Sequence, residues 1–152
     1  MTRAFVGLGA NLGDREATMQ RALELLSAEP AVELVAVSSV RETDPVGDAD
    51  QPRFLNAAAA VETALAPRKL LDRLLAIERA LGRTREGPRF APRTIDLDLL
   101  VYGHVQLDEP GVTVPHPRLH ERRFALEPLH ELEPSLVVPG RGRVAALLAR
   151  LE

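Results

Sequence analysis

The sequence of 152 residues has no cysteine and no tryptophan, one tyrosine, and no apolar run approaching the length of a membrane span. Without cysteine there is no disulfide framework, no thiol nucleophile and no zinc site built on thiolates, so a metal would be bound by oxygen or imidazole. Without a run of roughly 20 apolar residues we expect no membrane association. These absences favour a soluble, cytoplasmic protein and, if it binds a metal, a hard cation.

The composition is that of an ordinary globular protein, with 45% hydrophobic and 27% charged residues. We expect a single domain over residues 1–152, because no repeat, low-complexity tract or linker interrupts the chain. The formal net charge of -3 argues against a general nucleic-acid binder, which usually carries a basic excess. We also expect the protein to act as a monomer.

The pattern of apolar residues predicts a mixture of helices and strands. Asp14 is suited to cap a helix that ends before Pro30, and Pro67 to open a second helix that ends at Gly82. Residues 57–60 are four consecutive alanines, which favour helix by propensity, but two adjoining helices would leave too few strands for a sheet. The expected order is strand 2–8, helix 15–29, strand 32–40, strand 54–63, helix 67–81, strand 95–101, strand 112–114 and a helical region 116–132.

This order predicts an α+β fold with a ferredoxin-like βαββαβ core, in which helices pack on the faces of a largely antiparallel sheet. Such a fold does not name a function by itself. Function therefore has to be sought in clusters of side chains that can carry chemistry.

The first cluster is a pair of aspartates in the segment 95–101, which alternates apolar residues at 95, 97, 99 and 101 with Asp96 and Asp98. Side chains two residues apart on a strand leave the same face. Two such carboxylates can bind magnesium, which usually takes one or two carboxylates and completes its octahedron with phosphate oxygens and water. The alternative is a solvated strand face with two unrelated aspartates.

The second cluster is a set of four arginines in the segment 82–94, among glycines and prolines that exclude a continuous helix. Guanidinium groups stay charged and present forked donors suited to phosphate oxygens. Arginines next to two carboxylates suggest a polyphosphate held between a cationic loop and a carboxylate-bound metal. The alternative is a surface loop whose arginines pair with nearby acids. The four are Arg83, Arg85, Arg89 and Arg93.

Residues 89–99, RFAPRTIDLDL, closely resemble the signature of the 6-hydroxymethyl-7,8-dihydropterin pyrophosphokinase family. Further blocks occur in the family's order: GLGANLG at 7–13, TDPVG at 43–47, QPRFLNA at 51–57 and VPHP at 114–117. The resemblance extends from residue 6 to about residue 139. It implies a ferredoxin-like fold and, in the folate pathway, transfer of the βγ-pyrophosphate of ATP to the pterin hydroxymethyl oxygen with release of AMP.

The resemblance also implies roles for individual residues. Asp96 and Asp98 would be ligands of two magnesium ions bound with ATP, and Arg83 and Arg93 would be the loop cations associated with turnover. The pterin would stack between aromatic side chains, with its amide edge read by Asn56. The implied ATP-binding residues are Glu78, Arg85, Phe90, Arg93, Thr113, His116 and Arg122. The implied pterin-binding residues are Thr43, Asp44, Val46, Phe54, Asn56 and Phe124.

The chain departs from the family pattern at Phe90-Ala91, where tryptophan and glycine are common, and so lacks an indole donor and some backbone freedom. Two other functions would use the same clusters. One is a magnesium-dependent phosphohydrolase or nucleotidyltransferase with another acceptor, for which ATP conversion without pterin would be the sign. The other is a ferredoxin-like regulatory module, which would bind ATP and pterin without forming AMP.

Overall fold

An antiparallel sheet of five strands forms the centre of the molecule. The computed structural model describes residues 1–11, 13–44, 53–82 and 95–151. Their elements are β1 (Thr2–Ala10), α1 (Arg15–Ser27), β2 (Val32–Val37), β3 (Arg41–Thr43), β4 (Phe54–Thr63), α2 (Pro67–Ala80), β5 (Asp96–Tyr102), β6 (Leu107–Glu109), β7 (Val112–Val114), the 3-10 turn η1 (Leu119–Glu121), α3 (Arg123–Leu132), β8 (Val137–Val138), β9 (Gly142–Arg143) and α4 (Val144–Ala149).

The order of the strands confirms the predicted α+β fold. The sheet runs β2-β4-β1-β5, every neighbouring pair is antiparallel, and β3 pairs with the far end of β4. The core sequence of elements is thus the βαββαβ arrangement of ferredoxin-like folds. None of the helices in the described part of the chain is long and apolar enough to cross a membrane.

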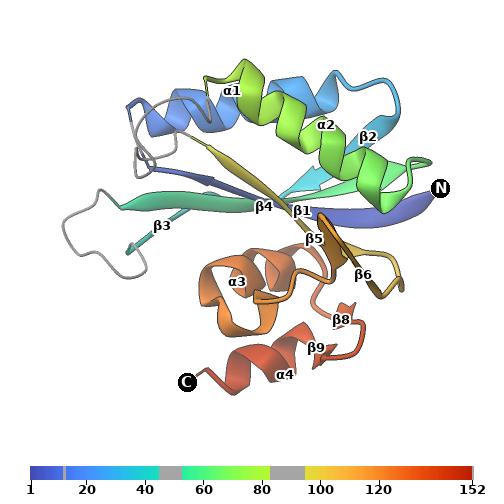
Figure 1. Ribbon diagram of the computed structural model, residues 1–152. Helices are drawn as coiled ribbons and strands as arrows, with labels where there is room; N and C mark the ends of the chain where they lie inside the picture. Colours follow the sequence, from blue (N-terminus) through green and yellow to red (C-terminus); the bar gives the residue numbers. More distant parts are fainter. Residues whose placement is uncertain (12, 45–52, 83–94, 152) are drawn as a thin grey trace.

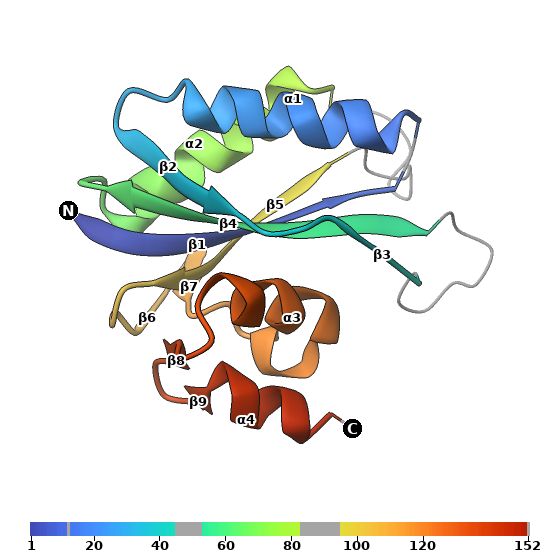
Figure 2. The same ribbon diagram turned by 180° about the vertical axis from the view of Figure 1, so that it is seen from behind.

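Helices cover both faces of the sheet. In Figures 1 and 2, α1 and α2 lie on one face, while α3 and α4 lie on the other. The alanine run in β4 serves both layers, because Ala57 and Ala59 belong to the core under α1 and α2, whereas Ala58 and Ala60 belong to the core under α3. Small side chains buried on both faces explain why this segment is a strand, as predicted, against its helix propensity.

The helix boundaries follow local chemistry that the sequence predicts. The Asp14 side chain accepts a hydrogen bond from the backbone N–H of Ala17 at 3.0 Å and so caps α1. Pro67 opens α2, where its missing N–H costs nothing. The predicted helical region 116–132 is in fact divided, with η1 preceding α3. The short elements β8, β9 and α4 were not predicted, because segments of two to six residues show no measurable periodicity.

The predicted strand 32–40 ends at Val37, and a separate strand, β3, follows it. Ser38 marks the break. Its backbone N–H donates to the carbonyl of Ala58 at 2.9 Å, and its side-chain hydroxyl accepts from the N–H of Ala58 at 2.9 Å. The Ser38 hydroxyl accepts the hydrogen bond that a backbone carbonyl would accept in a regular strand. The chain can therefore change direction after β2 and then pair with β4 a second time, as β3.

β5 departs from the predicted alternation at one residue. Phe5 pairs with Val101 and Val6 pairs with Leu99, so Leu100 is an extra residue, a β-bulge. Val101, predicted on the same face as Leu97 and Leu99, therefore lies in the core under α3 instead. The Leu100 carbonyl accepts a hydrogen bond from the backbone N–H of His116 at 2.9 Å, which attaches the segment before η1 to β5.

Candidate active site

A cavity of about 580 Å³ lies between the α3 face of the sheet and residues 118–127. One row of paired residues crosses its floor: Arg41 on β3 pairs with Asn56 on β4, Asn56 with Gly9 on β1, and Gly9 with Asp96 on β5. Directly paired residues present their side chains on the same face. The side chains of this row therefore all belong to the cavity side of the sheet.

The two glycines of β1 keep the middle of this floor open. A Cβ atom on Gly9 would lie 3.1 Å from Oδ1 of Asn56, and one on Gly7 would lie 3.1 Å from the side chain of Leu100. Both distances are shorter than ordinary carbon contacts. Any larger residue at position 9 would therefore press on the Asn56 amide, so the glycine leaves space between that amide and Asp96.

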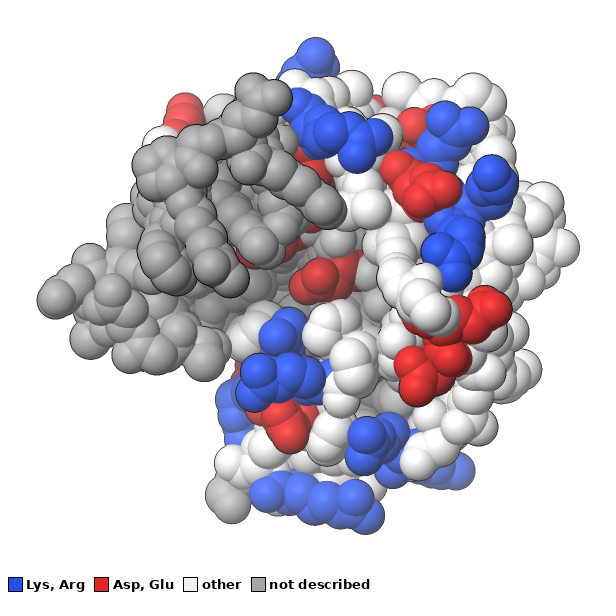
Figure 3. Space-filling view, in the orientation of Figure 1, with Lys and Arg blue, Asp and Glu red and all other residues white. Residues whose placement is uncertain are grey.

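Asp96 and Asp98 form the acidic wall of the cavity. Both are half-buried on β5 and both line the cavity. Leu97 between them faces the opposite core, and its backbone N–H donates to Oε2 of Glu78 at 2.7 Å. The alternation predicted for this strand therefore holds where it concerns the two carboxylates. Figure 3 shows acidic side chains in the hollowed middle of this face, with basic side chains below them.

The donor set fits magnesium that is held jointly with a substrate. Two carboxylates on one face supply hard oxygen ligands, and no group of three or more potential metal-ligating side chains occurs in the described ranges. Magnesium usually takes one or two carboxylates and leaves its other positions to phosphates and water. The site is therefore suited to a cation that arrives with a polyphosphate, whereas a cation bound wholly by protein would need more ligands.

The opposite wall carries three arginines together with Glu121 and Glu127. Arg118, Arg122 and Arg123 line the cavity from η1 and the start of α3. The Arg122 guanidinium lies 5.6 Å from the centre of the Phe124 ring, which is a cation–π distance. Arg118 and Arg123 form exposed ion pairs with acids one helical turn away, at 3.2 and 3.3 Å. Two of the three arginines are thus paired with glutamates of the same wall, and Arg122 is left as its net positive charge, facing the two aspartates. This arrangement is suited to an anionic substrate that carries a cation.

A third part of the cavity is suited to a flat ring. Phe54 and Phe124 line it from β4 and α3, together with Thr43 and Asp44. Asn56 is only 6% exposed, and its side-chain N–H donates to the hydroxyl of Thr43. A buried amide fixed in this way presents its remaining hydrogen-bonding groups in one orientation.

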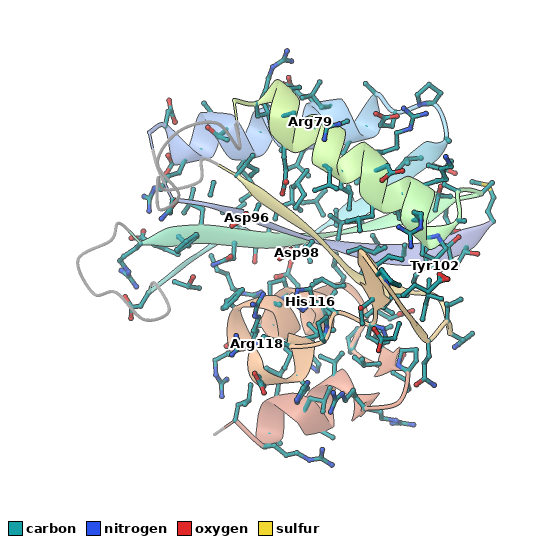
Figure 4. The ribbon with its side chains drawn as sticks, viewed as in Figure 1. Arg79, Asp96, Asp98, Tyr102, His116 and Arg118 are labelled. Carbon is teal, nitrogen blue, oxygen red and sulfur yellow. The ribbon has the colours of Figure 1, made fainter. Side chains whose placement is uncertain are left out.

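His116 lies beside Asp98, on the α3 side of β5 (Figure 4). Its Nδ1 accepts a hydrogen bond from the backbone N–H of Arg118 at 3.2 Å, so in the neutral ring the proton is on Nε2. Burial lowers the pKa of His116 below its ordinary value; the charge of Asp98 opposes this, and Arg122 and Arg118 add to it. The ring is therefore neutral at neutral pH.

We expect His116 to make stability depend on pH in the acidic range. Since its pKa is lower in the folded protein, the unfolded chain binds the proton first, and the free energy of unfolding falls as the pH drops below about 6.5. His116→Asn keeps an acceptor for the Arg118 N–H but does not titrate, so its stability should fall less over this range. Urea unfolding at pH 7.5 and pH 5.5 measures the difference; an equal loss in both proteins would contradict it.

The structure brings together most of the predicted residues that it describes. Glu78, Thr113 and His116 are not among the residues lining the cavity; Glu78 is buried against Leu97, and Thr113 donates to Asp108 at 3.1 Å. The predicted residues that line the cavity are Thr43, Asp44, Phe54, Asn56, Asp96, Asp98, Arg122 and Phe124. Val46, Arg83, Arg85, Phe90 and Arg93 lie outside the described residues.

Sequence reasoning missed two kinds of cavity residue. Arg118 and Arg123 stand close behind the VPHP block, where a run of basic residues was a usable signal. Arg41 carried no such signal, because its place in the cavity depends on β3, and β3 itself was not predicted.

Fold and site together define a small α+β protein whose cavity combines a carboxylate wall, a wall that carries arginines and an aromatic ring site, as suits a protein that binds a polyphosphate and a flat ring. The profile of the 7,8-dihydro-6-hydroxymethylpterin-pyrophosphokinase (HPPK) family matches residues 5–134. The chain therefore belongs to this family, as the sequence blocks implied. It is an ATP-dependent pyrophosphokinase of folate biosynthesis that acts on hydroxymethyldihydropterin, which favours this function over the hydrolase and the regulatory module.

Individual relatives agree with the family assignment. The 2-amino-4-hydroxy-6-hydroxymethyldihydropteridine pyrophosphokinase of Methylorubrum extorquens is 47% identical over 152 residues, covering 100% of this chain and 95% of that protein. The protein of the same name from Pseudomonas aeruginosa is 46% identical over 147 residues, covering 97% of this chain and 90% of that protein. Wild-type Plasmodium falciparum HPPK-DHPS has the same fold, with a TM-score of 0.75 and 13% identity; 98% of this chain matches 42% of that longer chain.

Proposed function

We propose that this chain holds ATP with two magnesium ions at the β5 end of the cavity and the pterin ring at the end formed by β3 and β4. The row Asn56–Gly9–Asp96 carries this proposal. Neighbouring strands lie about 4.8 Å apart, so Asn56 and Asp96 are separated by roughly 10 Å across an open glycine floor. That separation leaves space for a flat ring beside the amide and a phosphate beside the carboxylate.

At the β5 end, Asp96 and Asp98 would hold the magnesium ions. When bound, magnesium would neutralise charge on the phosphate oxygens and make the phosphorus easier to attack. Arg122 on the facing wall would donate hydrogen bonds to phosphate oxygens, so Asp96 and Asp98 would remain available to bind the magnesium ions. Because the acidic and basic groups stand on opposite walls, the triphosphate is oriented as well as bound.

At the other end, the rings of Phe54 and Phe124 would stack on the pterin, and Asn56, Thr43 and Asp44 would read its polar edge. This placement directs the hydroxymethyl oxygen toward the β5 end. The oxygen attacks the β-phosphorus in line and releases its proton to water, while the bond from the β-phosphorus to the oxygen bridging to the α-phosphate breaks and AMP leaves with that oxygen.

The remaining assignments belong to the same proposal. Arg83 and Arg93 would supply positive charge to the transferred group, and Arg85, Phe90, Glu78, Thr113 and His116 would contact ATP. Val46 would complete the pterin site. The support for these roles is the matching position of each residue in the family's sequence blocks. We further propose that residues 1–152 work as one domain in a cytoplasmic monomer.

Counting bound manganese by electron paramagnetic resonance tests the metal assignment, because Mn²⁺ replaces Mg²⁺ at oxygen sites. With α,β-methylene-ATP and 6-hydroxymethylpterin present, we expect two tightly bound ions per chain in the unmodified protein. Asp96→Asn and Asp98→Asn should each lose at least one ion. Two ions retained by both variants would refute the carboxylate assignment, and one ion in the unmodified protein would refute the number.

A further inference from the structure

Arg41 has a position in the cavity that the family's blocks do not assign. It begins β3, pairs with Asn56 on β4 and lines the cavity. The cavity therefore has a permanent positive charge at the end where the ring is proposed to bind. The Cα atoms of Arg41 and Asp96 are three strand spacings, or roughly 14 Å, apart across the floor.

The Arg41 guanidinium is fixed on one side and unsatisfied on the other. Its Nη2 donates to Oε1 of Glu131 at 2.9 Å. Its Nη1 is buried and has no hydrogen-bond acceptor among the described residues. A guanidinium cannot lose its charge, and a buried donor without an acceptor is costly, so an acceptor supplied by a ligand would be favoured here.

Glu131 is itself held in place, which makes it a firm support. It lies near the end of α3 and accepts hydrogen bonds from the backbone N–H of Ser39 at 2.7 Å and from the Ser39 hydroxyl at 2.6 Å. These hydrogen bonds from Ser39, and to a smaller extent the charge of Arg41, hold the pKa of Glu131 below its ordinary value, while the slight burial of the carboxylate opposes them. The carboxylate is therefore ionised at neutral pH and keeps Arg41 against the cavity wall.

We infer that Arg41 is a further substrate-binding residue, whose guanidinium donates a hydrogen bond to the oxo group of the pterin ring, with Glu131 as its positioning residue. The distance from the acidic wall separates this role from phosphate binding. The neighbours of Arg41 point to the same conclusion, because Asn56, Thr43 and Phe54 form the ring site. The residue would thus discriminate between a 4-oxo ring and a 4-amino ring, which presents a donor at that position.

This inference rests on the proposed placement of the pterin, and calorimetric titration can separate the two. The probes are 6-hydroxymethylpterin and 2,4-diamino-6-hydroxymethylpteridine, measured in the presence of α,β-methylene-ATP. We expect Arg41→Met to raise the Kd of the 4-oxo compound about tenfold, to leave the Kd of the ATP analogue unchanged and not to raise the Kd of the diamino compound. Glu131→Gln, which keeps the shape but weakens the support, should produce a smaller rise for the 4-oxo compound only.

Arg3→Met is the matched control, since Arg3 is also an ion-paired arginine of this sheet, 2.7 Å from Glu62, and does not line the cavity. It should leave both Kd values unchanged.

Equal weakening of the binding of both ring compounds by Arg41→Met, or no weakening of either, would overturn the inference. If Asn56→Ala also left pterin binding unchanged, the placement of the ring would fail; if only Asn56→Ala weakened it, the role of Arg41 alone would fail. Thermal unfolding confirms that each variant is folded.

Discussion

Asp98→Asn is expected to lower kcat by about three orders of magnitude, with Asp96→Asn close behind. The replacement keeps the shape of the side chain but removes the negative charge that the proposed cation needs. Both aspartates stand half-buried on the cavity face, while the core contacts of β5 are made by Leu97 and Leu99. The fold should therefore survive, and the loss should appear in turnover.

Steady-state assays with saturating ATP and pterin measure this effect, together with thermal unfolding of the same samples. Asp72→Asn is a suitable control, because Asp72 is exposed on α2 and is not among the cavity residues. The control should retain full activity. Normal turnover in Asp98→Asn at ordinary magnesium concentration would remove the carboxylates from the mechanism, and a loss of cooperative unfolding would make their role structural.

Glu78→Ala is expected to destabilise the protein by about 2 kcal/mol, which is a fall of roughly 5 °C in Tm for a chain of this size. Glu78 is only 2% exposed, and its carboxylate accepts from the N–H of Leu97. The substitution leaves that N–H buried without this acceptor. Because Leu97 stands between Asp96 and Asp98, we also expect kcat to fall as β5 loses its support.

Glu78→Gln is the informative companion, because the amide oxygen can still accept from Leu97 while the negative charge is gone. We expect it to unfold within a degree or two of the unmodified protein, by thermal unfolding followed by circular dichroism. Its Kd for ATP then tests the separate prediction that Glu78 contacts the nucleotide. Unfolding of Glu78→Ala at the same temperature as the unmodified protein would show that the bond to Leu97 contributes nothing to stability.

The sequence was most informative where chemistry and periodicity coincide. Asp96 and Asp98 were predicted on one strand face because the alternation with apolar residues is local, and the structure has them there. The alanine strand β4 required an argument about the whole sheet, since propensity alone favours a helix. β4 is buried under helices on both faces of the sheet, and this burial is the physical reason that the segment is a strand.

What could not be predicted depends on contacts between distant segments. The bulge at Leu100 arises from the register of β5 against β1, and it moves Val101 to the other core. The place of Arg41 depends on Ser38 and Glu131, which lie 93 residues apart and together set the course of β3. Neither the bulge at Leu100 nor the position of Arg41 produces a local sequence pattern, so neither can be predicted from this sequence alone.

Pyrophosphate transfer by this cavity is tested most directly by product analysis. The protein is incubated with ATP, magnesium and 6-hydroxymethyl-7,8-dihydropterin, with parallel samples that lack the pterin or the metal, and products are separated by ion-exchange chromatography. We expect AMP and the pterin pyrophosphate in equal amounts, and only when all three components are present. Formation of ADP or free phosphate, or of AMP without pterin, would contradict transfer of a pyrophosphoryl group between the two ends of the site.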